Sequence, residues 1–136
     1  TDITVLSYGS TLKVIEDVVT RLSQVDIDIE IIDAQSLLPF DINHDVVKSI
    51  QKTNRLIIID EDVPGGASSY LLNEILENQN GYEYLDSKPK TLTAKEHRAA
   101  YGTDGDYFSK PNAEDIFEAI YNIMREVNPL KFKKLY

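Results

Sequence analysis

The sequence predicts an α/β fold, a three-layer α/β/α arrangement in which helices cover both faces of a mainly parallel sheet of about four to five strands. Segments of strand-like and helical composition alternate along the chain, as they do where crossover helices join parallel strands. The apolar run 56–59 has no polar alternation, which is typical of a central strand covered on both sides. The chain of 136 residues suffices for one domain, which we assign to 1–127, followed by a basic tail over 128–136.

The first predicted unit is a strand over 3–8 followed by a helix. The strand is rich in β-branched and aromatic residues, Gly9 interrupts it, and Ser10 is placed to cap the helix. Apolar residues then recur at three- and four-residue steps, which is the spacing of one buried helical face. These residues are Leu12, Val14, Ile15, Val18, Val19 and Leu22.

The second predicted strand begins at 25–31, where acidic and apolar residues alternate strictly. We expect its start to be partly solvated and burial on both faces to begin at Ile32. After a connector at 37–40, Asp41 is placed to cap a helix that ends at Asn54. The predicted buried positions of this helix are Ile42, Val46, Val47 and Ile50.

Beyond the central strand, the break at 64–66 leads into a predicted helix over about 67–78. Its apolar stripe comprises Tyr70, Leu71, Ile75 and Leu76. A short strand is predicted at 90–94, and Asn112 is the expected cap of a final helix. This helix is expected to bury Ile116, Phe117, Ile120, Tyr121 and Met124. The basic tail from 128 is expected to be loose.

The chain is acidic, with 14 basic and 23 acidic residues and a net charge of −9. Residues 1–86 hold 16 acids and 5 bases, a net −11, whereas 87–136 hold 7 and 9, a net +2. This balance disfavours nucleic-acid and anionic-membrane binding and favours either a basic protein partner or simple solubility. A basic partner, if there is one, is expected to approach the first part of the chain. The chain has no cysteine, which excludes disulfides and thiolate chemistry, and its apolar runs are too short for a membrane span.

Ser10, Gly65 and Gly66 form a candidate pocket for an anion or another ligand at the strand ends, because backbone N–H groups point outward at a helix N-terminus. A tight turn with close backbone packing is the favoured alternative, since the acids at 60–62 would repel phosphate. Adjacent strand residues point to opposite faces, so we expect these acids to cap helices and to be solvated rather than to chelate a metal.

The residues alone identify no catalytic centre and no metal site. His44 and His97 lack a third ligand at a recognisable spacing, and a surface position is the favoured interpretation for both. The segment 104–106 (DGD) does not continue as a calcium loop and is interpreted as a polar turn.

An aromatic segment within 99–111 contains Tyr101, Tyr107 and Phe108 among charged neighbours. Aromatic residues with a polar rim are typical of interface cores, which makes these three residues candidates for partner binding. A loop that folds back onto its own domain has the same composition, and both interpretations stay open.

Several motifs in series resemble the C-terminal domain of the transketolase-like thiamine diphosphate enzymes. They are TVLSYGS at 4–10, IDAQSLLPFD at 32–41, KTNRLIIIDE at 52–61 and DVPGGA at 62–67. The closest similarity is to the beta-subunit portion of the decarboxylating component of 2-oxo acid dehydrogenases, which the segment KPNAEDI at 110–116 favours over transketolase proper. The segment 95–108 departs from the proline-rich loop of beta subunits and is similar to bacterial forms that fuse alpha and beta portions.

The resemblance implies a sheet in which the second strand lies beside the first, followed by the third and fourth, with an added antiparallel edge strand that is not evident here. It implies that thiamine diphosphate and magnesium bind in two preceding domains. By itself this domain is then expected to bind neither cofactor and to be inactive. The parent enzyme would decarboxylate a 2-oxo acid, either pyruvate or a branched-chain acid, and pass the acyl group to a lipoyl arm.

The resemblance also implies a role in assembly, in a cytoplasmic multienzyme complex. The expected partners are the upstream thiamine-binding domains, a second copy in a homodimer, and the basic subunit-binding domain of the lipoyl acyltransferase. Asp86 matches a motif position at which an acid meets that basic domain. The absence of an initial methionine agrees with the expectation that the chain is part of a longer protein.

Two other functional classes stay open. One is the C-terminal domain of a transketolase or of a deoxyxylulose phosphate synthase, against which the Leu-Pro-x-Asp motif argues. The other is a free-standing ligand-binding or regulatory α/β module, with its ligand near Ser10 and the glycine pair Gly65 and Gly66.

Overall fold

The computed structural model describes residues 1–95 and 110–135. The strands are β1 (Ile3–Ser7), β2 (Ile29–Asp33), β3 (Leu56–Ile59) and β4 (Lys90–Leu92). The helices are α1 (Thr11–Gln24), α2 (Asp45–Thr53), α3 (Ala67–Asn73) and α5 (Ala113–Val127), with a π-helical turn η1 (Glu74–Asn78) and a 3-10 turn η2 (Gly81–Tyr84). No helix in these ranges is both long enough and apolar enough to cross a membrane.

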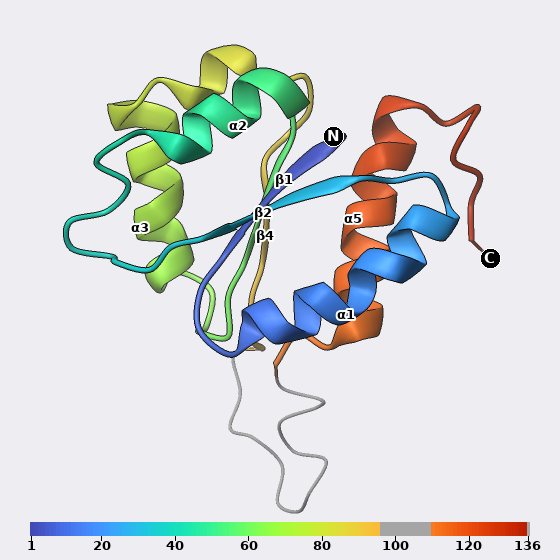
Figure 1. The fold of residues 1–136 in the computed structure, drawn as a ribbon, viewed down its shortest axis with the longest axis horizontal. Helices are drawn as coiled ribbons and strands as arrows, with labels where there is room; N and C mark the ends of the chain where they lie inside the picture. Colours follow the sequence, from blue (N-terminus) through green and yellow to red (C-terminus); the bar gives the residue numbers. More distant parts are fainter. Residues whose placement is uncertain (96–109, 136) are drawn as a thin grey trace, which may run out of the picture.

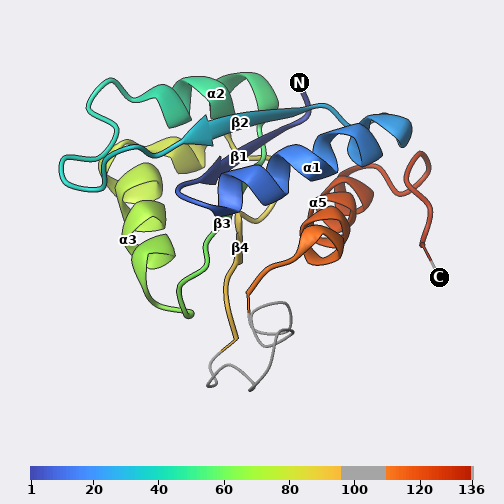
Figure 2. The same cartoon turned by 60° about the horizontal axis from the view of Figure 1, so that its bottom comes forward.

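The sheet has the strand order β2-β1-β3-β4, and every pairing is parallel. Helices α1 and α5 cover one face, and α2 and α3 cover the other (Figures 1 and 2). The predicted three-layer α/β/α fold is therefore confirmed, as is the strand order that the family resemblance implies. Within the described ranges the sheet has no antiparallel strand.

Alternate residues of the central strands supply two separate cores. Ile57 and Ile59 face the core under α1 and α5, whereas Leu56 and Ile58 face the core under α2 and α3. All four are buried, because β3 lies between β1 and β4 and has helices on both faces. The prediction of a central strand at 56–59 is confirmed.

Strand β2 lies at one edge of the sheet, pairing with β1 alone among the described elements. It begins at Ile29, later than the alternating pattern predicted. The prediction that both faces become buried from Ile32 is wrong, since that side chain is only half-buried. An edge strand keeps contact with solvent whatever its apolar content.

The start of α2 differs from its prediction. Asp41 does cap the helix, but from a position before its first turn: its Oδ1 accepts from Asp45 N at 2.7 Å and its Oδ2 from Val46 N at 3.1 Å. Ile42 therefore precedes the helix and is 72% exposed, so its predicted burial is wrong. The predicted end at Asn54 is confirmed, where a left-handed residue with φ of 61° terminates the helix.

The caps of α1 and α5 also differ from each other. The Asn112 side chain accepts from Asp115 N, and the Asp115 side chain accepts from Asn112 N, which completes a capping box and confirms that prediction. Ser10 precedes α1, but its hydroxyl makes no capping hydrogen bond and donates to Glu61 instead. The predicted side-chain cap at Ser10 is wrong.

The tail after α5 packs against the domain. Phe132 is 4% exposed, the Tyr121 hydroxyl donates to Lys133 O at 2.7 Å, and Lys131 Nζ lies 2.6 Å from Asp26 Oδ2. The expectation of a loose tail is wrong for 128–135, because an aromatic side chain anchors it in the core under α1 and α5. The domain boundary at 127 stays a prediction.

Candidate functional site

The carboxyl ends of β1 and β3 form the crevice where an open α/β sheet most often holds a ligand. From β1 the chain crosses to β2 on one side, and β3 then lies on the other side of β1, so the strand order reverses between them. Tyr8 and Ser10 follow β1 at this point, and the acids at 60–62 follow β3.

Asp60 is the buried polar centre of this crevice, with 1% of its surface exposed. Its Oδ1 accepts from the Tyr8 hydroxyl at 2.6 Å and from Asp62 N at 3.0 Å. Its Oδ2 accepts from Ser68 N at 3.1 Å, in the first turn of α3. Both carboxylate oxygens are thus engaged within the chain, and Asp60 joins the end of β1 to the start of α3.

Asp62 and the glycine pair build the turn that follows. The Asp62 carboxylate accepts from Val63 N at 2.8 Å and from Ala67 N at 3.4 Å. A Cβ at Gly66 would overlap this carboxylate, and Gly65 has a φ of +86° that favours glycine. The favoured interpretations, a tight turn and capping acids, describe this segment. Anion binding at Gly65 and Gly66 stays a prediction, and the Asp62 carboxylate at the start of α3 weighs against it.

Ser10 lines a cavity that does not include the glycine pair. Its hydroxyl donates to Glu61 Oε2 at 3.2 Å, and Lys110 Nζ lies 3.8 Å from the same oxygen. These residues line a cavity of about 490 Å³ together with Thr11, Val14 and 111–114, and neither glycine is among its lining residues. The structure therefore does not bring the three predicted pocket residues to one cavity.

Metal-ligating side chains do not cluster among the described residues. These residues contain no group of three or more His, Asp and Glu side chains able to hold a metal ion. The acids that follow β3 are engaged with backbone N–H groups, a hydroxyl and Lys110. That the cofactors bind in other domains stays a prediction. His44 is exposed, and the candidates His97, Tyr101, Tyr107, Phe108 and 104–106 lie outside the described residues.

The Tyr8 hydroxyl makes the stability of the folded domain depend on pH. Burial raises the pKa of its hydroxyl well above the usual value, and the hydrogen bond to Asp60 raises it further. Above pH about 10 the unfolded chain loses this proton while the folded chain keeps it, so stability falls as the pH rises. We expect Tyr8→Phe to make the fall in urea-unfolding free energy between pH about 9 and about 11 shallower. Tyr82→Phe, at an exposed ring, is the control, and equal slopes in Tyr8→Phe and the parent chain would contradict the prediction.

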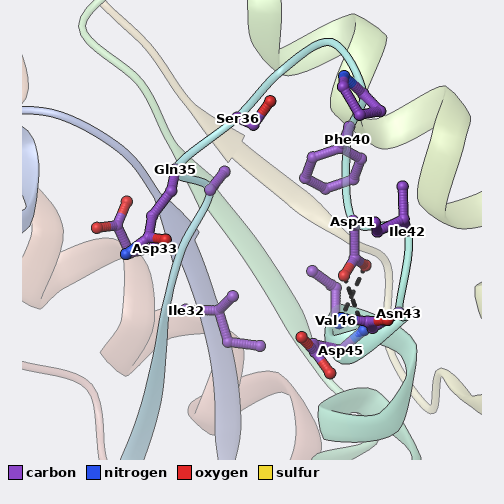
Figure 3. Close-up of a pocket in the computed structure, with 12 residues that line it drawn as sticks. Ile32, Asp33, Gln35, Ser36, Phe40, Asp41, Ile42, Asn43, Asp45 and Val46 are labelled. Atoms are coloured by element: carbon purple, nitrogen blue, oxygen red, sulfur yellow. Dashed lines mark hydrogen bonds between the residues drawn. The ribbon is translucent and has the colours of Figure 1, made fainter.

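A second hollow, of about 240 Å³, lies where β2 ends and α2 begins (Figure 3). Its floor is apolar and includes Phe40 and Val46, which belong to the core under α2 and α3. Its rim carries Asp33, Asp41 and Asp45. The segment 37–40 is predicted as a connector, but the sequence does not predict this groove, because only the folded chain brings the residues that line it together.

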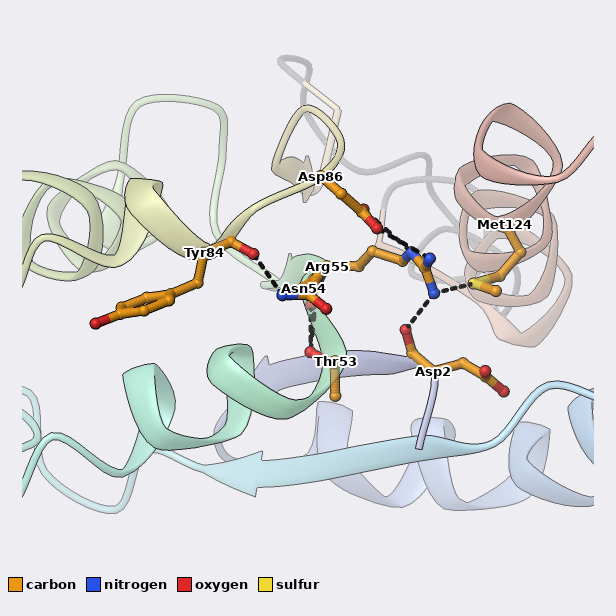
Figure 4. A network of polar contacts seen from close by, with 7 residues as sticks. All are labelled: Asp2, Thr53, Asn54, Arg55, Tyr84, Asp86 and Met124. Carbon is orange, nitrogen blue, oxygen red and sulfur yellow. Dashed lines mark hydrogen bonds and ion pairs between the residues drawn. The ribbon is translucent and has the colours of Figure 1, made fainter.

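Asp86, the predicted partner-binding acid, is part of a polar network centred on Arg55 (Figure 4). Arg55 Nε donates to Asp86 Oδ1 at 3.2 Å and Nη2 to Oδ2 at 3.0 Å, a two-point contact. Arg55 Nη1 also donates to Asp2 O at 3.1 Å and lies 4.0 Å from Met124 Sδ. The guanidinium side chain is 17% exposed and the carboxylate side chain 42%, so Asp86 still faces solvent.

Nothing in the sequence marks Arg55 as the centre of a network. The one available signal was its place directly before an entirely apolar strand, where a cation marks the strand boundary. Its partners are far away in the chain, so no local spacing identifies them. The network holds the start of β1, the start of β3 and helix α5 together at the amino ends of the strands.

The family model described as "Transketolase, C-terminal domain" matches residues 1–116, which include the whole sheet and the crevice at its carboxyl edge. The chain belongs to the transketolase C-terminal domain family. A solved structure, "Split gene transketolase, inactive beta4 tetramer", superposes on this transketolase C-terminal domain with a TM-score of 0.66 at 18% identity, covering 98% of this chain and 39% of that one. At that identity the likeness shows the fold alone.

Curated relatives of this transketolase C-terminal domain are beta subunits of larger enzymes. "Pyruvate dehydrogenase E1 component subunit beta" of Mesostigma viride is 36% identical over 124 residues, 90% of this chain and 37% of the relative. The protein of the same name from Rhizobium meliloti is 26% identical over 88% of this chain and 25% of its own length. "Acetoin:2,6-dichlorophenolindophenol oxidoreductase subunit beta" of Bacillus subtilis is 32% identical over 68% of this chain and 27% of the relative. The chain thus spans between 25% and 37% of the length of these relatives.

Proposed function

We propose that this domain is the C-terminal assembly domain of a thiamine diphosphate-dependent 2-oxo acid dehydrogenase component. That component would decarboxylate a 2-oxo acid and transfer the acyl group to a lipoyl arm. The observation that supports the proposal is the combination of a family match over residues 1–116 with relatives named as pyruvate dehydrogenase beta subunits. A bacterial parent that fuses alpha and beta portions, and a cytoplasmic location, belong to the same proposal.

In this proposal the chemistry belongs to the upstream domains, which hold thiamine diphosphate and magnesium, and this domain supplies no catalytic residue. The acids after β3 support that division, because they stabilise the β1–α3 junction and are already engaged. Calorimetric titration of the 136-residue chain with thiamine diphosphate and magnesium tests it directly. We expect no heat of binding. Saturable tight binding would refute the proposal that the cofactors are held by the upstream domains.

The substrate of the parent enzyme is the point on which the relatives differ. Pyruvate is favoured by the names of the beta subunits from Mesostigma viride and Rhizobium meliloti, and acetoin by the Bacillus subtilis relative. Dichlorophenolindophenol reduction by the full-length protein, with pyruvate, branched-chain 2-oxo acids and acetoin in turn, decides among them. Reduction with none of these substrates, by protein that retains its cofactor, would refute the proposed activity.

The proposed partners are a second copy, the upstream domains and the basic subunit-binding domain of the lipoyl acyltransferase. Because Asp86 stays partly exposed beside Arg55, it is available to a basic partner. We expect Asp86→Asn to weaken binding of the subunit-binding domain about tenfold at low salt, and the unmodified interaction to weaken as salt rises. Fluorescence anisotropy at two salt concentrations measures both effects.

The matched control is Asp26→Asn, which also removes an exposed, ion-paired carboxylate. An equal loss of affinity for the subunit-binding domain in both variants would show a general charge effect and would contradict a specific role for Asp86. Binding by the unmodified chain that Asp86→Asn leaves unchanged would place the acyltransferase surface elsewhere and leave the assembly role intact.

A further inference from the structure

The groove between β2 and α2 combines an apolar floor with exposed apolar side chains. Phe40 is 8% exposed and Val46 is fully buried, so the floor is continuous with the core under α2 and α3. Ile42 lines the groove and is 72% exposed (Figure 3). Leu38, which directly precedes the lining residue Pro39 in the sequence, is 82% exposed. Aliphatic side chains this exposed beside a hollow are typical of an interaction surface.

The rim of the groove is acidic. Asp33 is exposed at the end of β2, and Asp45 is exposed at the start of α2 with Lys48 Nζ at 3.8 Å. The carboxylate of Asp41 is directed inward, onto the first N–H groups of α2. No Lys or Arg is present among the described residues that line the groove. The unbalanced charge that faces an incoming group is therefore negative, and the complementary group is a cation.

The groove lies away from the Arg55–Asp86 network. Asp33 ends β2, whereas Arg55 immediately precedes β3, and the strands are parallel. The groove therefore lies at the carboxyl ends of the parallel strands, and the Arg55–Asp86 network lies at their amino ends. A partner at the groove would therefore be additional to one at Asp86.

We propose that this groove is a docking surface for a basic segment of another protein that carries an aliphatic anchor side chain. The anchor packs on the floor between Phe40 and Ile42, and flanking cations approach Asp33 and Asp45. A second copy of this chain is a poorer occupant of this groove, because residues 1–86 of that copy carry a net charge of −11 and residues 87–136 a net charge of only +2.

The probe for this surface is a short fluorescein-labelled peptide of alternating lysine and leucine, with a lysine–serine peptide as its reference. We expect the lysine–leucine peptide to bind and the reference to bind about tenfold more weakly, because it lacks the anchor. Amide chemical-shift changes in ¹⁵N-labelled protein should concentrate at 32–36 and 40–46. Equal binding of both peptides, or shift changes spread over α1, would overturn the proposal.

Two matched pairs of exposed positions separate the groove from general charge and general hydrophobicity. Asp33→Lys and Glu16→Lys change the charge equally, and Ile42→Ser and Leu130→Ser each remove a largely exposed aliphatic side chain, 72% and 83% exposed respectively. We expect the groove variants to weaken peptide binding about tenfold and the controls less than about twofold. Thermal unfolding of each variant verifies that it folds. Similar losses in both members of a pair would overturn the proposal, as would concentration-dependent self-association that Ile42→Ser abolishes, since a second copy would then be the occupant.

Discussion

Asp60→Ala is expected to lower the free energy of unfolding by about 3 to 5 kcal/mol. The carboxylate is 1% exposed and accepts from the Tyr8 hydroxyl, Asp62 N and Ser68 N. Alanine would leave these donors without their acceptor at a buried site, and water replaces a lost acceptor poorly there. Urea unfolding followed by circular dichroism at neutral pH measures the loss.

Two further variants make the Asp60 experiment specific. Asp60→Asn keeps one acceptor oxygen but places an NH₂ group against N–H or hydroxyl donors, so an intermediate loss is expected. Glu61→Ala removes the neighbouring, exposed carboxylate and is expected to cost less than about 1 kcal/mol. If Asp60→Ala were no more destabilising than Glu61→Ala, the buried Asp60 carboxylate would not stabilise the fold as its contacts indicate.

Arg55→Ala is expected to lower the free energy of unfolding by about 2 kcal/mol. It removes the two-point contact with Asp86, the hydrogen bond to Asp2 O and the packing of the side-chain stem near Met124. The expected loss exceeds that for an ordinary surface ion pair because the Arg55 side chain is only 17% exposed. Urea unfolding gives the value, and a double-mutant cycle with Asp86→Ala isolates the pair from the other contacts.

The control is Lys52→Ala, which breaks a short but more exposed ion pair with Glu30. Its expected cost is about 0.5 kcal/mol. Arg55→Lys is expected to restore less than half of the lost stability, because an ammonium group lacks the planar fork that bonds Asp86 at two points. Full stability in Arg55→Lys, or equal losses for Arg55→Ala and Lys52→Ala, would contradict the geometric argument.

The Arg55 network also bears on the proposed partner site. Asp86 bonds an arginine of its own chain, so a basic partner has to share or displace that contact. The cost of displacement favours partners whose cations approach the exposed side of the carboxylate. Binding and stability measured on the same Asp86 variants therefore separate the residue's structural contribution from its proposed contact with a partner.

Periodicity and caps determined much of the fold from the sequence alone. The apolar run at 56–59 predicted the central strand, and the helical spacing predicted α1, α2 and α5. Asn112 and Asn54 marked helix ends correctly, because capping involves backbone groups only a few residues away. Such features depend on local geometry, which a sequence pattern records directly.

The tertiary structure decided the features that depend on distant neighbours. The position of β2 at the sheet edge left Ile32 half-buried, and the turn closed by Asp41 left Ile42 exposed above the groove. Asp60, after β3, is engaged by residues that the fold brings from the end of β1 and the start of α3. Asp86 is likewise engaged by Arg55. The sequence by itself determined the order of strands and helices along the chain and the acidic character of residues 1–86. Contacts between residues far apart in the chain decided which carboxylates stabilise the fold and which stay available to a partner. No local sequence pattern encodes such contacts.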